Sequence, residues 1–135
     1  METFNIVLEG YWREKNKTGI PVYPGLFIVY ETKFNADTNT VTLIRLLYIG
    51  EAENLNNRIL KHPKLDEWSK NIAAGNELSY SVARVETNNR TRIKAALIYK
   101  FRPMLNIDFK DSFLYDATMI LLSGKTNLLS PHFTV

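Results

Sequence analysis

The chain is built around residues 43–62, which read LIRLLYIGEAENLNNRILKH. The apolar run up to Gly50 predicts a strand, and the pattern after a short polar turn predicts a helix that carries Arg58 and His62. These two side chains are four residues apart and therefore share one helical face. We expect them to reach one small volume together with the phenol of Tyr48, an arrangement suited to handling a phosphate. The alternative is a β–α unit whose polar groups reach the surface by chance.

Length and composition indicate one globular domain, residues 1–135. Of the 135 residues, 45% are hydrophobic and 12% are aromatic, which is enough for a packed core. The absence of cysteine excludes a disulfide scaffold and thiol catalysis and fits a reducing, cytoplasmic location. No apolar run approaches the ~18 residues of a membrane span, and the N-terminus has no secretory pattern, so we expect no membrane partner. A net charge of +3 is compatible with nucleic acid.

Local patterns predict an α+β fold around a small antiparallel or mixed sheet, with extra strands at both ends. Strands are predicted at residues 4–12, 26–31, 41–48, 78–85, 117–122 and 132–135. Helices are predicted at 55–62, capped by Asn54, and at 65–74 and 88–102, with turns or loops at 13–18, 34–40 and 108–116. The apolar run 46–49 places strand 41–48 at the centre of the sheet, whereas the alternation in 78–85 predicts a half-exposed strand.

Five short motifs follow one another along the chain. They are Pro24-Gly25-Leu26-Phe27, Tyr48-Ile49-Gly50 with Arg58 in the next helix, His62, Ala96-Leu97-Ile98, and Pro103-Met104-Leu105-Asn106. Together they resemble the GIY-YIG endonuclease family. The resemblance covers about residues 24–106, which leaves 107–135 as a C-terminal extension with strands.

The resemblance implies a phosphodiesterase that cuts DNA with the help of one divalent cation, Mg²⁺ or Mn²⁺. In that family two tyrosines lie near the attacking water, an arginine contacts the scissile phosphate, and a histidine or tyrosine assists proton transfer. A glutamate on the closing helix holds the cation. Tyr48, Arg58, His62 and Asn106 match family positions, and we expect them to form the catalytic site.

Two residues depart from the family pattern. Phe27 replaces the first signature tyrosine and has no hydroxyl for orienting a water. Lys94 stands where the metal-binding glutamate belongs, and its ammonium cannot ligate a cation. Possible substitute carboxylates are Glu51, Glu53 and Glu86. Glu51 directly follows the motif, and Tyr23 is the candidate to replace the lost hydroxyl. We therefore expect weak cleavage or none, and no cofactor if the protein is inactive.

The predicted closing helix carries five basic residues and no acid: Arg90, Arg92, Lys94, Lys100 and Arg102. Arg90 and Lys94 share a face, and such a like-charged pair destabilises a helix by a few tenths of a kcal/mol. A nucleic-acid phosphate or the carboxylate of Glu77 or Glu86 could compensate these positive charges, or the side chains are simply solvated. The residues predicted to contact nucleic acid are Arg58, Lys61, Arg90, Arg92 and Lys94.

The sequence leaves three functions open. The first is a GIY-YIG-like protein that acts on DNA, with Phe27, Tyr48, Arg58, His62 and Lys94 converging on one pocket. The second is a non-catalytic module of the same fold that binds nucleic acid or a protein through that cleft. The third is a homodimer formed through the terminal strands, in which the cleft has lost its role.

Overall fold

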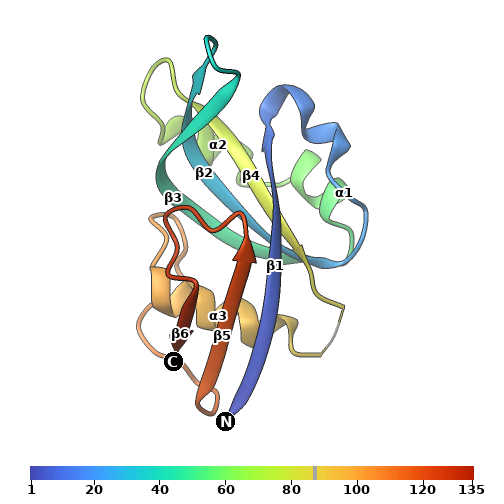
Figure 1. The fold of residues 1–135 in the computed structure, drawn as a ribbon, viewed down its shortest axis with the longest axis vertical. Coiled ribbons are helices and arrows are strands. Elements are labelled where there is room, and N and C mark those ends of the chain that lie inside the picture. Colours follow the sequence, from blue (N-terminus) through green and yellow to red (C-terminus); the bar gives the residue numbers. More distant parts are fainter. Residues whose placement is uncertain (87) are drawn as a thin grey trace.

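The computed structural model describes residues 1–86 and 88–135. Over these residues the chain forms a six-stranded sheet with helices on both faces, which confirms the predicted α+β class (Figure 1). The strands are β1 (Glu2–Arg13), β2 (Gly25–Asn35), β3 (Thr40–Ala52), β4 (Glu77–Arg84), β5 (Thr118–Gly124) and β6 (His132–Thr134). The helices are the 3₁₀ helix η1 (Glu14–Gly19), α1 (Leu55–Leu60), α2 (Leu65–Lys70) and α3 (Arg90–Phe101).

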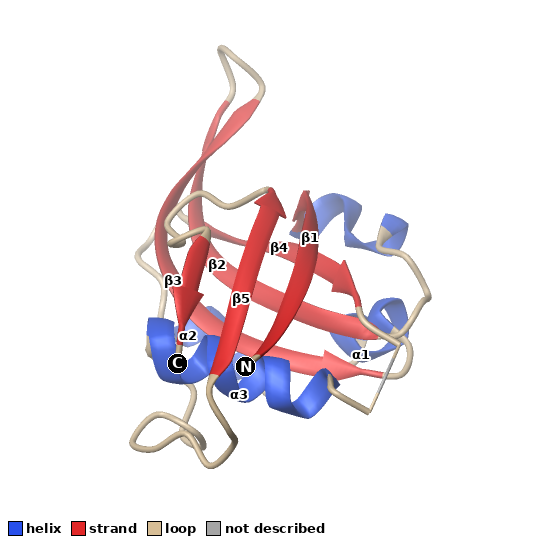
Figure 2. Ribbon diagram, turned by 60° about the horizontal axis from the view of Figure 1, so that its bottom comes forward, coloured by secondary structure: helices blue, strands red, loops and turns tan. Residues whose placement is uncertain are grey.

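The sheet has the order β3-β2-β4-β1-β5-β6, and β1 joins its two parts (Figure 2). Residues 2–8 of β1 pair in parallel with β5, whereas residues 9–13 pair antiparallel with β4. The remaining neighbours are antiparallel, so the sheet is mixed. The C-terminal strands β5 and β6 therefore extend the sheet at one end, as expected for residues 107–135.

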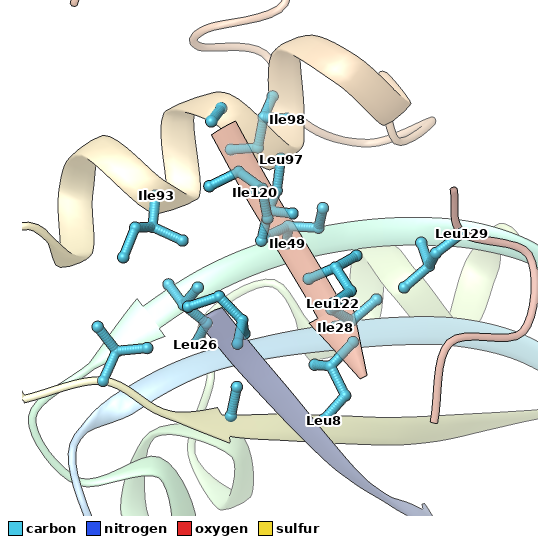
Figure 3. Close-up of a cluster of buried hydrophobic side chains, with 14 of the residues drawn as sticks. Leu8, Leu26, Ile28, Ile49, Ile93, Leu97, Ile98, Ile120, Leu122 and Leu129 are labelled. Atoms are coloured by element: carbon cyan, nitrogen blue, oxygen red, sulfur yellow. The ribbon is translucent and has the colours of Figure 1, made fainter. Parts of the chain in front are cut away.

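Both faces of the sheet are covered, and β2 supplies side chains to both cores. Leu26 and Ile28 face the core beneath α3, whereas Phe27 and Val29 face the core beneath α1 and α2. Figure 3 shows the first of these cores, where α3 packs over β2, β3 and β5. A strand buried on both faces has no polar side, which explains the unbroken apolar run of this segment.

The prediction that strand 41–48 lies at the centre of the sheet is wrong, because β3 is an edge strand. Its outer edge is covered by the segment after α3. The backbone N–H groups of Met104 and Leu105 donate to the carbonyls of Leu46 and Leu47, at 3.4 and 2.8 Å. The strand is apolar because this segment and the helices cover it, and the sequence of β3 alone cannot distinguish such a cover from a neighbouring strand.

The prediction that strand 78–85 is half exposed is also wrong. β4 lies between β2 and β1, and its interior residues are all buried. The alternating serines are buried with the rest, and Ser79 shares a 2.7 Å hydrogen bond with Thr32 of β2. Ser79 is thus a polar residue that a sheet tolerates because it is paired, whereas the buried hydroxyl of Ser81 has no hydrogen-bond partner among the described residues. The two serines together give β4 the alternation of a half-exposed strand.

The helices α1 and α2 are shorter than predicted. Asn54 caps α1 as expected, because its side chain accepts the N–H of Asn57 at 3.0 Å. α2 ends at Lys70, where the side-chain amide of Asn71 donates to the carbonyl of Glu67 at 2.8 Å. A side chain that satisfies a terminal carbonyl of the helix fits the early end of α2.

Other boundaries also differ from the predictions. β2 and β3 run four residues past their predicted ends, to Asn35 and Ala52. Residues predicted as a turn at 13–18 form η1, and α3 begins at Arg90 instead of residue 88. None of the described helices is both long and apolar enough to cross a bilayer.

Candidate functional site

The signature glycine makes room for an aromatic ring. Gly50 of β3 lies opposite Phe27 of β2, and a Cβ atom at Gly50 would lie only 2.3 Å from the ring carbon Cζ of Phe27. Phe27 is fully buried there. The departed position therefore keeps a packing role, because the ring occupies the space left by the missing side chain.

Four aromatic side chains cluster at this end of β3: Phe27, Tyr48, His62 and Trp68. The ring centroids of His62 and Trp68 are 4.5 Å apart, and those of Tyr48 and Trp68 are 5.3 Å apart. Phe27 lies 6.1 Å from Tyr48 and 5.7 Å from His62. Trp68 is fully buried, and nothing in the sequence motifs indicates that its indole packs against Tyr48 and His62.

His62 is buried, and one of its ring nitrogens already accepts a hydrogen bond. Its Nδ1 accepts the backbone N–H of Lys64 at 3.0 Å. Burial, together with the nearby charges of Arg58 and Lys64, lowers the pKa of His62 to about 4. The imidazole is therefore neutral at physiological pH, with its proton on Nε2, so it can donate a hydrogen bond but has no free basic nitrogen.

Tyr48 is half buried at the mouth of the cluster. Burial raises the pKa of its hydroxyl, the charge of Arg58 opposes that rise, and the carboxylates of Asp108 and Glu67 add to it. The phenol therefore stays protonated at neutral pH and can donate a hydrogen bond. Arg58 itself is exposed on α1, close enough to act on both Tyr48 and His62.

Lys94, which the sequence resemblance aligns with a metal-binding glutamate, forms an ion pair with Glu51. The Nζ of Lys94 is 2.8 Å from Oε2 of Glu51, and Oε1 of Glu51 accepts a hydrogen bond from Arg90 at 3.2 Å. Thr91 donates to the same carboxylate at 3.1 Å. Burial opposes ionisation of Glu51, but these bonds and the charge of Lys94 lower its pKa below the ordinary value. The carboxylate of Glu51 reaches α3, where both of its oxygens already accept bonds from Arg90, Thr91 and Lys94.

These donors do not fit a divalent cation. Mg²⁺ needs free oxygen ligands, whereas here an ammonium already faces the carboxylate of Glu51. Over the described residues, no group of three or more histidine or carboxylate side chains is arranged to hold a metal. Of the other substitutes, Glu53 pairs with Arg90 at 2.6 Å and Glu86 with Arg84 at 2.5 Å.

Three basic residues of α3, Arg90, Arg92 and Lys94, find their counter-ions inside the protein. Arg90 is held by Glu51 and Glu53, and Arg92 contacts Glu2 at 3.1 Å and the hydroxyl of Thr118 at 2.8 Å. Glu77 and Glu86, which the sequence suggested as partners, pair instead with Arg13 and Arg84. The carboxylates that compensate α3 come from strand segments distant in sequence, so spacing along the helix could not identify them.

Asn106 serves as a clamp on β3. Its Oδ1 accepts the N–H of Ile49 at 2.8 Å, and its Nδ2 donates to the carbonyl of Ile49 at 3.0 Å. The buried amide thus replaces the two hydrogen bonds that a neighbouring strand would supply. This geometry positions Tyr48 and Gly50, which flank Ile49, and it turns the side-chain amide of Asn106 toward the backbone of β3.

The predicted residues converge only in part. Tyr48 and Lys94 line one hollow of about 170 Å³, together with Lys64, which the sequence reasoning missed. Arg58 lines a neighbouring depression with Glu51, and Phe27 lies buried beneath the surface. The sequence does contain a pattern that points to Lys64, because the basic residues Arg58, Lys61 and Lys64 recur at a three-residue spacing. Lys61 is exposed at the end of α1.

Tyr23 does not replace the hydroxyl that Phe27 lacks. Its own hydroxyl donates to Glu9 at 2.6 Å, so this phenol is engaged with β1 and not with Tyr48. The prediction for Tyr23 is therefore wrong, because the extended segment before β2 turns the ring toward β1.

The GIY-YIG resemblance thus rests on the sequence motifs alone. Comparisons with protein-family models, with curated proteins and with solved structures found no match to this chain.

Proposed function

We propose that this protein is a GIY-YIG-like domain that acts on DNA by binding its phosphodiester backbone, with weak metal-dependent cleavage or none. The observation that carries the proposal is the ion pair between Lys94 and Glu51. It places an ammonium where the family carries a metal-binding carboxylate, and it occupies the carboxylate that a substitute metal would need. A phosphate can then be bound directly by side chains, without a bridging metal.

The groups available for that contact lie around Tyr48. Arg58 is exposed and, among the described residues, has no carboxylate partner, so its guanidinium can form a bidentate contact with a phosphate. The protonated phenol of Tyr48 can donate to another phosphate oxygen. Lys61 and Lys64 add positive charge nearby. These residues support DNA binding better than Arg90 and Arg92, whose side chains are held by carboxylates of the protein itself.

The competing reading is an active nuclease of the same family. Catalysis would need a group that activates water, yet His62 is neutral and its Nδ1 already accepts a hydrogen bond. A cation would need an anchor, and both oxygens of Glu51 already accept bonds. A polar site that keeps its phosphate-binding groups and lacks free ligands is better suited to binding than to hydrolysis.

The test is DNA binding measured against salt, with EDTA or with Mg²⁺. We expect binding that is insensitive to EDTA and whose log affinity falls linearly with log salt. Arg58→Ala should weaken binding to all sequences and reduce the slope by about one. Lys33→Ala is the matched control, because Lys33 is exposed on β2 near the hairpin tip. Undetectable binding at low salt would refute the proposal and favour a protein partner.

A further inference from the structure

The hollow beside Tyr48 has a polar side and an apolar side. It is lined by residues of β3, the turn after α1, α3 and the segment that follows Asn106. Its volume of about 170 Å³ is below the roughly 300 Å³ at which pockets for whole small molecules begin. The hollow therefore suits one part of a longer ligand better than a free molecule.

Two lysines form the polar side. Lys64 lies over the ring of Tyr48, with its Nζ 5.3 Å from the ring centroid, and Lys94 lies over Phe109 at 5.5 Å. Both ammonium groups are thus held at the wall by aromatic rings. Among the described residues that line the hollow, Asp108 is the one acid. Glu51 offsets the charge of Lys94, whereas no residue of the described ranges 1–86 and 88–135 forms an ion pair with Lys64.

Two apolar residues of the segment after Asn106, Ile107 and Phe109, line the hollow beside the lysines. Ile107 is 79% exposed although it follows directly on the clamped Asn106, so the fold holds an aliphatic side chain in solvent beside the lysines. Phe109 is half buried and has a φ of 68°, a left-handed conformation that is uncommon for an aromatic residue. Backbone strain of this kind is concentrated at ligand-binding sites.

We propose, on the basis of the proposed function, that this hollow takes one unpaired nucleotide of a DNA strand. The phosphate lies between Lys64 and Lys94, and the base rests on Ile107 and Phe109. Positive charge beside an apolar platform is the arrangement that single strands need, because each nucleotide offers an anion and an apolar face. A paired base inside a duplex keeps both faces in the helical stack, so a blunt duplex offers the platform only the outer faces of its two terminal pairs.

The experiment compares two labelled DNAs by fluorescence anisotropy: a blunt duplex, and the same duplex with a single-stranded tail. We expect the tail to tighten binding by about tenfold, the size of one base-stacking contact. Ile107→Gln should remove most of that preference and leave the affinity for the blunt duplex unchanged. Leu114→Gln is the matched control, because Leu114 is 81% exposed, belongs to the same loop region and does not line the hollow.

A second variant tests the apolar lining independently of Ile107→Gln, in case that substitution acts by disturbing the fold. Phe109→Leu keeps an apolar side chain but removes the ring, so it should also reduce the preference for the tail, while circular dichroism reports an intact fold. Equal binding of both DNAs by the unaltered protein would overturn this inference and leave the proposed function standing. Binding of neither DNA would overturn the proposed function itself.

Discussion

Single residues at the site act first through packing. The ring of Phe27 fills the space that a side chain at Gly50 would take, since a Cβ there would meet the ring at 2.3 Å. We predict that Gly50→Ala lowers the free energy of unfolding by about 1–3 kcal/mol, the usual effect of overpacking. Urea unfolding measures this loss. In a Phe27→Leu background, Gly50→Ala should destabilise the protein less than it does with Phe27 present. An equal loss in both backgrounds would show that the ring is not the obstacle.

The chemistry of the departed positions can be reversed. We predict that the unaltered protein cuts DNA very slowly or not at all with Mg²⁺ or Mn²⁺, and that Lys94→Glu with Phe27→Tyr gains measurable nicking of supercoiled plasmid. Lys94→Glu removes the ammonium from Glu51 Oε2 and adds a second carboxylate, and the two carboxylates together can anchor a cation. Each single change should do less, because the parts act as a unit. Metal-dependent cutting by the unaltered protein that is lost in Glu51→Ala would contradict this prediction.

His62 makes the stability of the fold depend on pH. The pKa of His62 is about 4 in the folded protein and 6.5 when unperturbed. Between these two values His62 is protonated in the unfolded chain and neutral in the folded protein. Stability should therefore fall as the pH falls from 6.5 toward 4, by on the order of 1–3 kcal/mol.

Urea unfolding between pH 6.5 and 4.5 isolates this effect, because carboxylates with a lowered pKa, such as Glu51, contribute only below their ordinary value of 4.5. His62→Gln should flatten the profile in this window. If His62→Gln keeps the full pH dependence of stability, a titratable group other than His62 causes that dependence.

At the scale of elements, the site depends on how the edge of β3 is covered. Asn106 pairs with both backbone groups of Ile49, which are buried with it. We predict that Asn106→Ala destabilises the protein by about 1–3 kcal/mol, since it leaves a buried donor and acceptor unpaired. Hydrogen exchange should show the Ile49 amide losing protection before its neighbours in β2. Asn5→Ala, at an exposed position of β1, should leave both quantities unchanged.

The elements also show what the sequence could predict. The strand and helix types followed from local patterns, because turn residues, a cap and apolar periodicity act between near neighbours. The positions of β3 and β4 in the sheet did not, because they depend on contacts with segments distant in sequence, such as residues 104–106 and β1. The same limit applies to the site: Lys94 and Glu51 were each identified, but not their ion pair.

At the scale of the whole molecule, the site lies where both layers of helices reach one strand. α1 brings Arg58 to one side of the end of β3, and α3 brings Lys94 to the other. The two cores on opposite faces of the sheet hold these helices in place. Dimerisation through the terminal strands remains a prediction, and β6, the outermost strand of the described sheet, is the edge available for it.

Finally, the pairing of β5 brings the two ends of the chain together. Thr118 pairs with Glu2 on one side and exchanges two backbone hydrogen bonds with Val135, at 2.8 and 2.9 Å (Figure 1). The ends are thus about two strand spacings apart, roughly 10 Å. A circular permutant that joins Val135 to Met1 through a short flexible linker and opens at the hairpin tip, residues 36–39, should keep the native fold. Its near-UV circular dichroism would then match that of the parent chain.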